Sequence, residues 1–315
     1  GSPESKEALS SVKSIYVEMN QVDEYVDFTK EVPEGDITRS EQDSLTYIAS
    51  ENQYMNGNCE KAVDGFTKYL TKFPEGSFVL EANFYKAECD YKAQRYDNAL
   101  KSYDFIINQQ RSRFTANAAS RAAQINHMRS NYEAALEDYI RLEENADQPG
   151  MIMNALAGQM QCNYALKRYG LAIQSGQKLL AVDKLPENLQ AEGHITLARS
   201  AYALTNTDLA RKEYLETVKL SKNEIAAEAK YMLAQLDFEN AKYDECEKTV
   251  FALSENYASY DYWVAKGFLL LADVYVKKGN TFQAKQTLQS IIDNYEGKDL
   301  VDEARAKLAA IGDTN

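Results

Sequence analysis

The stretch Tyr96-Asp97-Asn98-Ala99-Leu100-Lys101-Ser102-Tyr103 decides the fold of this 315-residue chain. It contains an aromatic residue, two variable residues, a small residue and, four positions later, a bulky residue. The same pattern returns, in strict or looser form, in stretches that begin at Cys59, Tyr132, Tyr169, Thr207, Tyr243 and Thr281. A phrase that recurs along the whole chain indicates an internal repeat.

The small residue of this phrase recurs with a nearly constant spacing of 36 to 38 residues. We call these residues the second-helix small column; they are Ala62, Ala99, Ala135, Ala172, Ala210, Cys246 and Ala284. A period in this range is typical of an array of structural units, each of which contacts only its neighbours.

Another column lies twelve residues before each of these positions. This first-helix small column consists of Ser50, Ala87, Ala123, Met160, Ala198, Ala234 and Ala272. Turn signals such as Asn56-Gly57-Asn58 and Lys278-Gly279-Asn280 separate the two columns. Small residues at facing positions let two helices approach closely. Each unit is therefore predicted to be a helix, a tight turn and a second helix, and the fold class to be all-α.

The composition limits the function. Only 5 Pro and 14 Gly interrupt the chain, which favours long helices. The net charge of −13 argues against a nucleic-acid-binding surface, which needs clustered Lys and Arg. The longest apolar runs, such as residues 268–272, are too short to cross a bilayer, so no membrane insertion is expected.

The cysteines show no metal-binding or redox spacing. Cys59, Cys89, Cys162 and Cys246 each fall where a helix is expected to bury a small side chain. We interpret all four as structural and reduced, although a disulfide remains an alternative.

With these two columns, the chain resembles the tetratricopeptide repeat family. The first unit matches the family pattern best, with Gly57 in the turn, Ala62 and Phe66 on the second helix, and Pro74 after it. Later units lose the glycine and the proline but keep the small and aromatic positions. The resemblance covers roughly residues 43–297, with a period longer than is usual in the family. It implies a right-handed α-α superhelix of antiparallel helix hairpins that binds a protein or peptide on its concave face.

The junction at residues 68–77, Lys-Tyr-Leu-Thr-Lys-Phe-Pro-Glu-Gly-Ser, is similar to that of cell-envelope members of the family. Those members include the lipoprotein of the outer-membrane β-barrel assembly machine and the Tol-Pal accessory protein. This resemblance implies a location in the periplasm or cell envelope, with the cytoplasm as the alternative.

We predict three segments. Residues 1–39 form a degenerate leading repeat and a linker, because Tyr25 lies 37 residues before Ala62, in step with the array. Residues 40–297 form seven repeats. Residues 298–315 form a capping helix, in which Leu300, Ala304 and Leu308 share one face. We expect the C-terminal end of the array to be complete and the N-terminal end to continue from a longer repeat protein.

The sequence carries no catalytic motif, and His127 and His194 are far apart, so we expect neither an enzyme nor a cofactor or metal site. In the family, the first helix of each hairpin lines the concave face. Two columns on these helices are candidates for contact with a partner. The polar column is Glu51, Glu88, Gln124, Gln161, Arg199, Gln235 and Asp273, and the aromatic column is Tyr54, Tyr91, His127, Tyr164, Tyr202, Phe238 and Val276. The predicted partner-binding residues are Tyr54, Glu88, Tyr91, Gln124, His127, Gln161, Tyr164, Arg199, Tyr202 and Gln235.

The aromatic column has a second interpretation. The family places a large packing residue one position earlier, where this chain has Gln53, Asp90, Asn126, Asn163 and Asp237. A slight rotation of each first helix would turn the aromatic column into the core. The leading hypothesis is a protein-interaction scaffold for a protein or peptide of unknown identity. The alternative is a purely architectural segment, or one that dimerises through its N-terminal edge.

Overall fold

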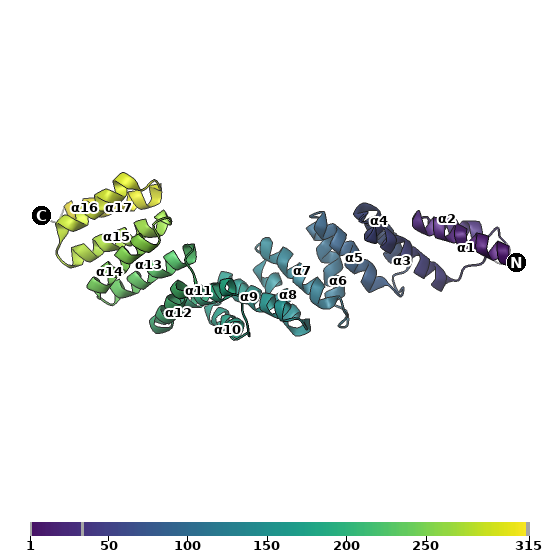
Figure 1. Cartoon of the computed structure of the whole chain (residues 1–315), viewed down its shortest axis with the longest axis horizontal. Helices are drawn as coiled ribbons and strands as arrows, with labels where there is room; N and C mark the ends of the chain where they lie inside the picture. Colours follow the sequence, from purple (N-terminus) through teal and green to yellow (C-terminus); the bar gives the residue numbers. More distant parts are fainter. Residues whose placement is uncertain (1, 33–34, 313–315) are drawn as a thin grey trace. The chain divides into compact units, whose positions relative to one another are not determined.

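Seventeen α-helices and no strand make up the part of the chain that the computed structural model describes, residues 2–32 and 35–312 (Figure 1). The predicted all-α fold class is confirmed. Gly1, residues 33–34 of the expected linker and residues 313–315 of the expected capping segment lie outside the described residues. The helices are α1 (Pro3–Glu18), α2 (Val22–Thr29), α3 (Arg39–Met55), α4 (Cys59–Lys72), α5 (Val79–Lys92), α6 (Tyr96–Ile107), α7 (Thr115–Met128), α8 (Tyr132–Asn145), α9 (Pro149–Ala165), α10 (Tyr169–Leu180), α11 (Glu187–Ala203), α12 (Thr207–Leu220), α13 (Glu224–Glu239), α14 (Tyr243–Asn256), α15 (Asp261–Lys277), α16 (Thr281–Asn294) and α17 (Lys298–Gly312).

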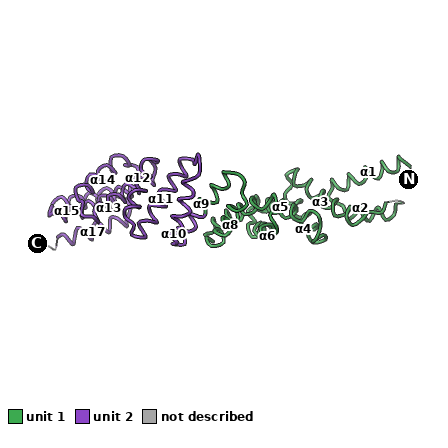
Figure 2. Tube along the Cα trace, turned by 90° about the horizontal axis from the view of Figure 1, so that it is seen from below, with its two compact units in different colours: residues 1–158 green, residues 159–315 purple. Residues whose placement is uncertain are grey.

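The chain forms two compact units, residues 1–158 (unit 1) and 159–315 (unit 2), drawn green and purple in Figure 2. In unit 1 the hairpins α3–α4, α5–α6 and α7–α8 follow the shorter pair α1–α2. In unit 2 the hairpins α11–α12, α13–α14 and α15–α16 are followed by α17, which packs on α16. Within each unit, the second helix of one hairpin packs on the first helix of the next. Each hairpin therefore buries its apolar side against a neighbour.

All seven hairpins from α3 to α16 close with the same turn. The residue three positions after the aromatic column has a left-handed conformation, with φ between 54° and 78°. The next amide donates a hydrogen bond to the carbonyl five residues back, as from Asn58 N to Gln53 O and from Lys242 N to Asp237 O, both at 2.8 Å. This Schellman ending favours glycine at the left-handed position. The residues found there are Gly57, Gln94, Ser130, Lys167, Thr205, Ala241 and Gly279.

Both small columns lie where the helices cross. Every residue of the second-helix small column is fully buried, and the residues of the first-helix small column are at most 1% exposed. The bulky residues one turn further along the second helix, such as Phe66, Tyr103 and Tyr214, are buried too. The two columns predicted from the period are thus the crossing points of the hairpins.

Gly176 stands at the bulky position of the α9–α10 hairpin. A Cβ atom there would lie 2.0 Å from Leu197 Cδ1 and 3.0 Å from Met160 Sδ. Met160 is the large exception in the first-helix small column. The missing side chain at residue 176 is therefore offset by larger neighbours, which keeps the interior filled.

Polar side chains are buried one position before the aromatic column. Gln53, Asp90, Asn126, Asn163 and Asp237 are at most 8% exposed. Most have polar partners: Asn58 Nδ2 donates to Gln53 Oε1 at 3.1 Å, Arg95 Nε to Asp90 Oδ1 at 2.7 Å, and Arg211 Nη2 to Asp237 Oδ1 at 2.7 Å. Such partners offset the cost of burying these groups. Because this column occupies the core position, the first helices are not rotated, and the aromatic column stays half-buried except for the exposed Val276.

Cys59 and Cys89 form a disulfide, with Cα atoms 5.2 Å apart. Cys59 begins α4 and Cys89 lies in α5, so the bond joins consecutive hairpins. The prediction that all four cysteines are reduced was wrong for this pair. The two residues are 30 positions apart, and only the packing of α4 on α5 brings them together. Cys162 and Cys246 are free and buried, as predicted.

Asp138 of α8 is a buried carboxyl group in unit 1. Its Oδ2 atom accepts a hydrogen bond from Asn126 Nδ2 at 2.8 Å, and it borders a cavity of about 350 Å³ between α6 and α8. Burial raises the pKa of Asp138 to about 7; the hydrogen bond from Asn126 lowers it, and the charges of Asp104 and Glu137 raise it. Near neutral pH the folded chain therefore holds a proton that the unfolded chain has released.

Replacing Ala241 by glycine is expected to stabilise the protein by about 0.5–1 kcal/mol, because its φ of 54° is costly for a residue with a Cβ atom. Urea unfolding measures the change. Ala306 is a matched control in the same unit, an exposed residue in the middle of α17. Ala306→Gly should destabilise by about 1 kcal/mol. Equal destabilisation by both changes would contradict the strain assigned to the turn.

The variant Asp138→Asn is expected to be more stable than the parent above neutral pH and closer to it in acid. Because the pKa of Asp138 is raised in the folded chain, its neutral carboxyl group stabilises the parent fully below the unfolded-state pKa. The parent loses this stabilisation as pH rises through about 7. Asparagine keeps an acceptor for Asn126 without a charge. The difference in Tm should grow from about pH 5 to about pH 8. The exposed Asp183→Asn serves as control, and a difference that shrinks over this range would refute the assignment.

Candidate functional site

The first helices of unit 1, α3, α5 and α7, are joined side by side through the predicted site residues. The rings of Tyr54 on α3 and Tyr85 on α5 have centroids 4.6 Å apart, and Lys92 Nζ lies 5.5 Å from the Tyr54 ring. Between α5 and α7, the guanidinium of Arg121 lies 4.6 Å from the ring centroid of Tyr91. We call the side of α3, α5 and α7 that carries the polar and aromatic columns the unit-1 face.

Arg121 brings three predicted residues into one cluster. Its Nε atom lies 3.5 Å from Glu88 Oε1, and its Nη1 atom donates to Gln124 Oε1 at 3.4 Å. The Tyr91 hydroxyl donates to the same Gln124 oxygen at 3.4 Å. Glu88 also accepts a hydrogen bond of 2.6 Å from the Tyr103 hydroxyl. Glu88, Tyr91 and Gln124 thus form one network that spans two hairpins.

His127 lies apart from this network. Its ring packs edge-on against Tyr132, 5.5 Å away, at the start of the second helix of its own hairpin. Ring contacts at the equivalent positions recur in the pairs Tyr91–Tyr96, which is also edge-on, and Tyr164–Tyr169 and Phe238–Tyr243, which are tilted, with centroids 5.7 to 5.8 Å apart. The aromatic residues therefore lean on their own hairpins and leave part of each ring exposed.

In unit 2 the polar column braces neighbouring first helices. Arg199 of α11 donates two hydrogen bonds to the carboxylate of Glu228 of α13, one of them from Nε to Oε1 at 2.6 Å. Gln161 Nε2 donates to Glu192 Oε2 at 3.5 Å. A two-pronged arginine–carboxylate pair with both side chains largely buried fixes the register of the two helices.

Glu239 of α13 holds two further predicted residues. Its Oε1 atom accepts hydrogen bonds from the Tyr202 hydroxyl at 2.5 Å and from Gln235 Nε2 at 2.9 Å. Burial and the bond to Glu239 raise the pKa of Tyr202 to about 12. Burial also raises the pKa of Tyr164, the remaining predicted residue of this unit. All these phenols are therefore neutral donors at physiological pH.

Exposed apolar side chains share the unit-1 face. Ile48 and Met55 on α3 and Met128 on α7 are 38%, 64% and 58% exposed. Ile48 lies three residues before Glu51, Met55 four after it, and Met128 four after Gln124. This spacing places them on the same side of their helices as the polar column. Flexible methionine side chains beside aromatic rings suit a surface that binds another chain.

Sequence reasoning missed the residues that connect these columns. Arg121, Tyr85 and Lys92 lie one helical turn from Gln124 or Glu88. Arg121 and Tyr85 have no equivalent of the same type in another hairpin, and Lys92 has one only at Lys277, so they leave no clear periodic signal. Glu239, which holds Tyr202 and Gln235, does not repeat either. Its helical spacing of four residues from the polar column is the signal that could have found it, and a spacing of three or four residues applies equally to Arg121, Tyr85 and Lys92. Glu228 could have been found from the period, because glutamate also stands at the equivalent positions 81 and 192.

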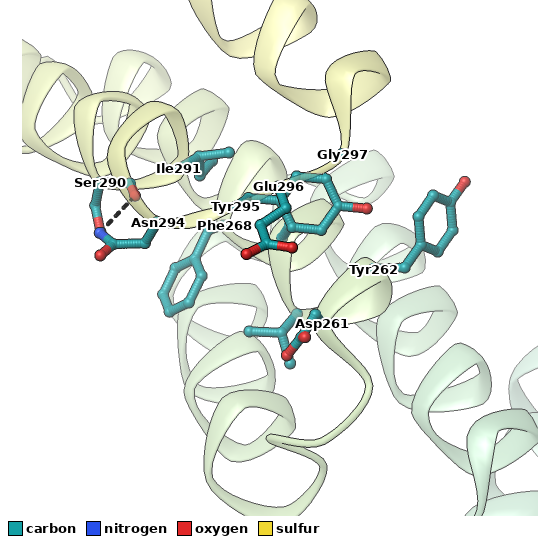
Figure 3. Close-up of a pocket in the computed structure, with 11 residues that line it drawn as sticks. Asp261, Tyr262, Phe268, Ser290, Ile291, Asn294, Tyr295, Glu296 and Gly297 are labelled. Carbon is teal, nitrogen blue, oxygen red and sulfur yellow. Dashed lines mark hydrogen bonds between the residues drawn. The ribbon is translucent and has the colours of Figure 1, made fainter.

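A separate pocket opens in unit 2 between the start of α15 and the end of α16, with a cavity of about 590 Å³ (Figure 3). Apolar side chains from both helices line it, among them Ala265, Phe268 and Ile291. Tyr295 and Glu296 come from the connection to α17, and Asp261 and Tyr262 from the first turn of α15. In Figure 3 the carboxylates of Asp261 and Glu296 and the rings of Phe268 and Tyr295 surround the same space.

Within the described residues, no grouping of His, Cys, Asp and Glu could hold a metal ion. None of the described helices has the length and apolar character needed to span a membrane. The predicted columns and this pocket are candidate recognition surfaces among the described residues.

Comparison with known proteins agrees with this architecture. Residues 267–297, with Ala272 and Ala284 from the two small columns, match the sequence model of the tetratricopeptide repeat family. No curated protein matches the sequence significantly. The structure is similar to the C-terminal part of a TPR repeat-containing protein from Cytophaga hutchinsonii, with 15% identity and a TM-score of 0.58 over 81% of this chain and 98% of that one.

A signal transduction ATPase with numerous domains and a tetratricopeptide repeat sensor, from Pyrococcus horikoshii, is also similar. It has 13% identity and a TM-score of 0.56 over 95% of this chain and 49% of that one. Likeness at this identity shows the fold. The chain therefore carries a tetratricopeptide repeat at residues 267–297 and has the fold of tetratricopeptide repeat proteins.

Proposed function

We propose that the chain is a protein-interaction scaffold without catalytic activity, and that a protein or peptide partner binds along the unit-1 face. In the family this side of the hairpins is the concave one. The observation that carries the proposal is the exposure of Ile48, Met55 and Met128 beside a cluster of aromatic rings and Arg121. The partner that best fits this face is an extended segment of chain with apolar side chains.

The energetics favour this face. Burying a fully exposed large apolar side chain contributes about 1.5–3 kcal/mol. Ile48, Met55 and Met128 are 38% to 64% exposed, so each would contribute part of that amount to the binding free energy. Arg121 is partly exposed, and its guanidinium is held in place by Glu88 and Tyr91, so little side-chain entropy is lost on binding. Aromatic residues and arginine are the types most often found at the centres of interfaces.

The predicted residues of unit 2 take a second place in this proposal. The hydrogen-bonding groups of Gln161, Arg199 and Tyr202 are already engaged by glutamates of the next first helix, and Gln235 is engaged by Glu239 of its own helix. A partner that reached them would have to contact exposed edges of the side chains or replace existing bonds. Contact of these residues and of Tyr164 with a partner stays a prediction.

A second candidate function is dimerisation through the N-terminal edge. Ile15 of α1 and Met19, the residue that follows this helix, are 55% and 58% exposed. They lie four residues apart and therefore form a small apolar strip on one side of the helix. Self-association that buries this strip would favour an architectural role over the binding of a separate partner.

The proposed location is the periplasm or cell envelope. The Cys59–Cys89 disulfide supports it, because such bonds persist in oxidising compartments and are rare in the cytosol of mesophiles. The similarity of residues 68–77 to cell-envelope members of the family points the same way. A cytoplasmic location remains the alternative that an experiment must reject.

Photo-crosslinking in the source organism tests the unit-1 face. A benzoyl-phenylalanine introduced at Met55 or Met128 is expected to give a discrete adduct, because both side chains are exposed on this face. Ile140 of α8 is a matched control, an exposed apolar residue of the same unit on a second helix. Adducts from residue 140 as abundant as those from residue 128 would count against the face. An adduct only between copies of the chain would favour the architectural alternative.

The state of the cysteines in cells tests the location. We expect a thiol-reactive maleimide polymer, added to the denatured protein, to label two cysteines before reduction and four after it, because Cys59 and Cys89 are bonded while Cys162 and Cys246 are free. The Cys59→Ser/Cys89→Ser variant should show two labels in both conditions. Four labels before reduction in the parent would place the chain in a reducing compartment and reject the envelope.

A further inference from the structure

The pocket at the start of α15 has an unbalanced charge. Asp261 and Glu296 line it, and none of its eleven lining residues is a lysine or arginine. Among the described residues, neither carboxylate forms a hydrogen bond or an ion pair. The chain elsewhere pairs many of its acidic groups, as in Asp273 with Lys307 at 2.6 Å. Two exposed carboxylates that line a cavity with aromatic walls and no cation in its lining leave room for a positive group from outside.

The aromatic walls suit the same kind of group. Phe268, Tyr262 and Tyr295 line the cavity together with the acids. The face of an aromatic ring attracts an ammonium or guanidinium group, and the apolar stem of lysine or arginine gains from the surrounding hydrocarbon. A neighbouring cluster shows this chemistry within the protein. Lys266 Nζ lies 5.1 Å from the ring of Tyr231, 5.5 Å from that of Tyr262 and 5.6 Å from that of Trp263.

Gly297 sets the position of one wall. A Cβ atom at this residue would lie 2.4 Å from Tyr295 Cε1 and 2.6 Å from its hydroxyl oxygen. The Tyr295 ring can therefore pack over the backbone of residue 297 only because that residue has no side chain. Burial raises the pKa of Tyr295, and the carboxylates of Asp299 and Asp261 raise it further.

We propose that this pocket binds the side chain of a lysine or arginine from a protein partner. The aromatic walls contact the stem and the cationic head, and Asp261 and Glu296 accept its hydrogen bonds. The net charge of −13 favours a basic partner over an acidic one. The pocket lies in unit 2, so this proposal goes beyond the unit-1 face and can hold or fail independently of it.

The test uses short peptides on the full chain. Acetylated and amidated Gly-Arg-Gly and Gly-Lys-Gly are titrated and followed by ligand-observed NMR, with Gly-Gln-Gly as the uncharged counterpart. We expect saturable binding of the basic peptides on the order of 1 mM, weakened by salt, and at least about tenfold weaker binding of the glutamine peptide.

The variant Asp261→Asn/Glu296→Gln should weaken binding of the arginine peptide by about tenfold or more. A matched control is Glu187→Gln/Asp183→Asn, which removes the same charge in the same unit from the first residue of α11 and the loop before it. This control should bind within about twofold of the parent. Tyr262→Leu, at a residue that is 40% exposed, should weaken binding by about threefold without loss of folding.

Three results would overturn the proposal. The first is equal binding by the pocket variant and the charge-matched control, and the second is equal binding of the glutamine peptide. The third concerns the source of the cation. Free spermidine that binds at the pocket about as tightly as the arginine peptide would assign the site to a small polyamine. Loss of crosslinking at the unit-1 face would leave all three measurements unaffected.

Discussion

The close approach of two helices within each hairpin is the constraint on which the rest of the structure depends. At all seven crossings the buried residue of the second helix is alanine or cysteine. At six of the seven the buried residue of the first helix is alanine or serine. Such contact fixes where the next turn of the second helix places its bulky side chain. It also requires the chain to reverse within a few residues. The left-handed turn and its hydrogen bond follow from this geometry and not from the type of residue at the left-handed position.

This constraint explains which parts of the fold could be predicted. Small residues at a constant spacing are visible in the sequence, so the hairpins and their crossings could be found from Ala62, Ala99 and their equivalents. The turns could not be read in the same way, because Lys167 and Ala241 carry no glycine signal and take their left-handed backbone from the hairpin around them. The burial of Asp90 and Asp237 was equally hidden. It depends on Arg95 and Arg211, whose partners are known only once the helices pack.

The candidate face divides along the same line. Its two columns follow the period and could be predicted. Some of their contacts depend on a residue such as Arg121 that does not repeat, although the acceptor Glu228 has equivalents at Glu81 and Glu192. The polar column had been expected to face a partner. In unit 2 Gln161 and Arg199 of this column also join one first helix to the next, with hydrogen-bonding groups that a ligand would use. In unit 1 the exposed side chains of Met55 and Met128 add apolar surface that is not used to join neighbouring helices. A side chain on this side of the hairpins can either join neighbouring first helices or contact a partner, so the two roles compete for the same positions.

The opposite ends of the hairpins escape this competition. At the turn end, the backbone hydrogen bonds and the aromatic pairs are nearly identical from one hairpin to the next, which leaves little room for a distinctive site. At the open end, the loops differ in length and sequence, and nothing repeats to tie them together. The pocket formed by Asp261, Tyr295 and Glu296 lies there, where Gly297 lets a tyrosine ring fold over the backbone. In an array whose repeats must share their crossings, specificity for a partner has most freedom to arise in the segments that the period does not control.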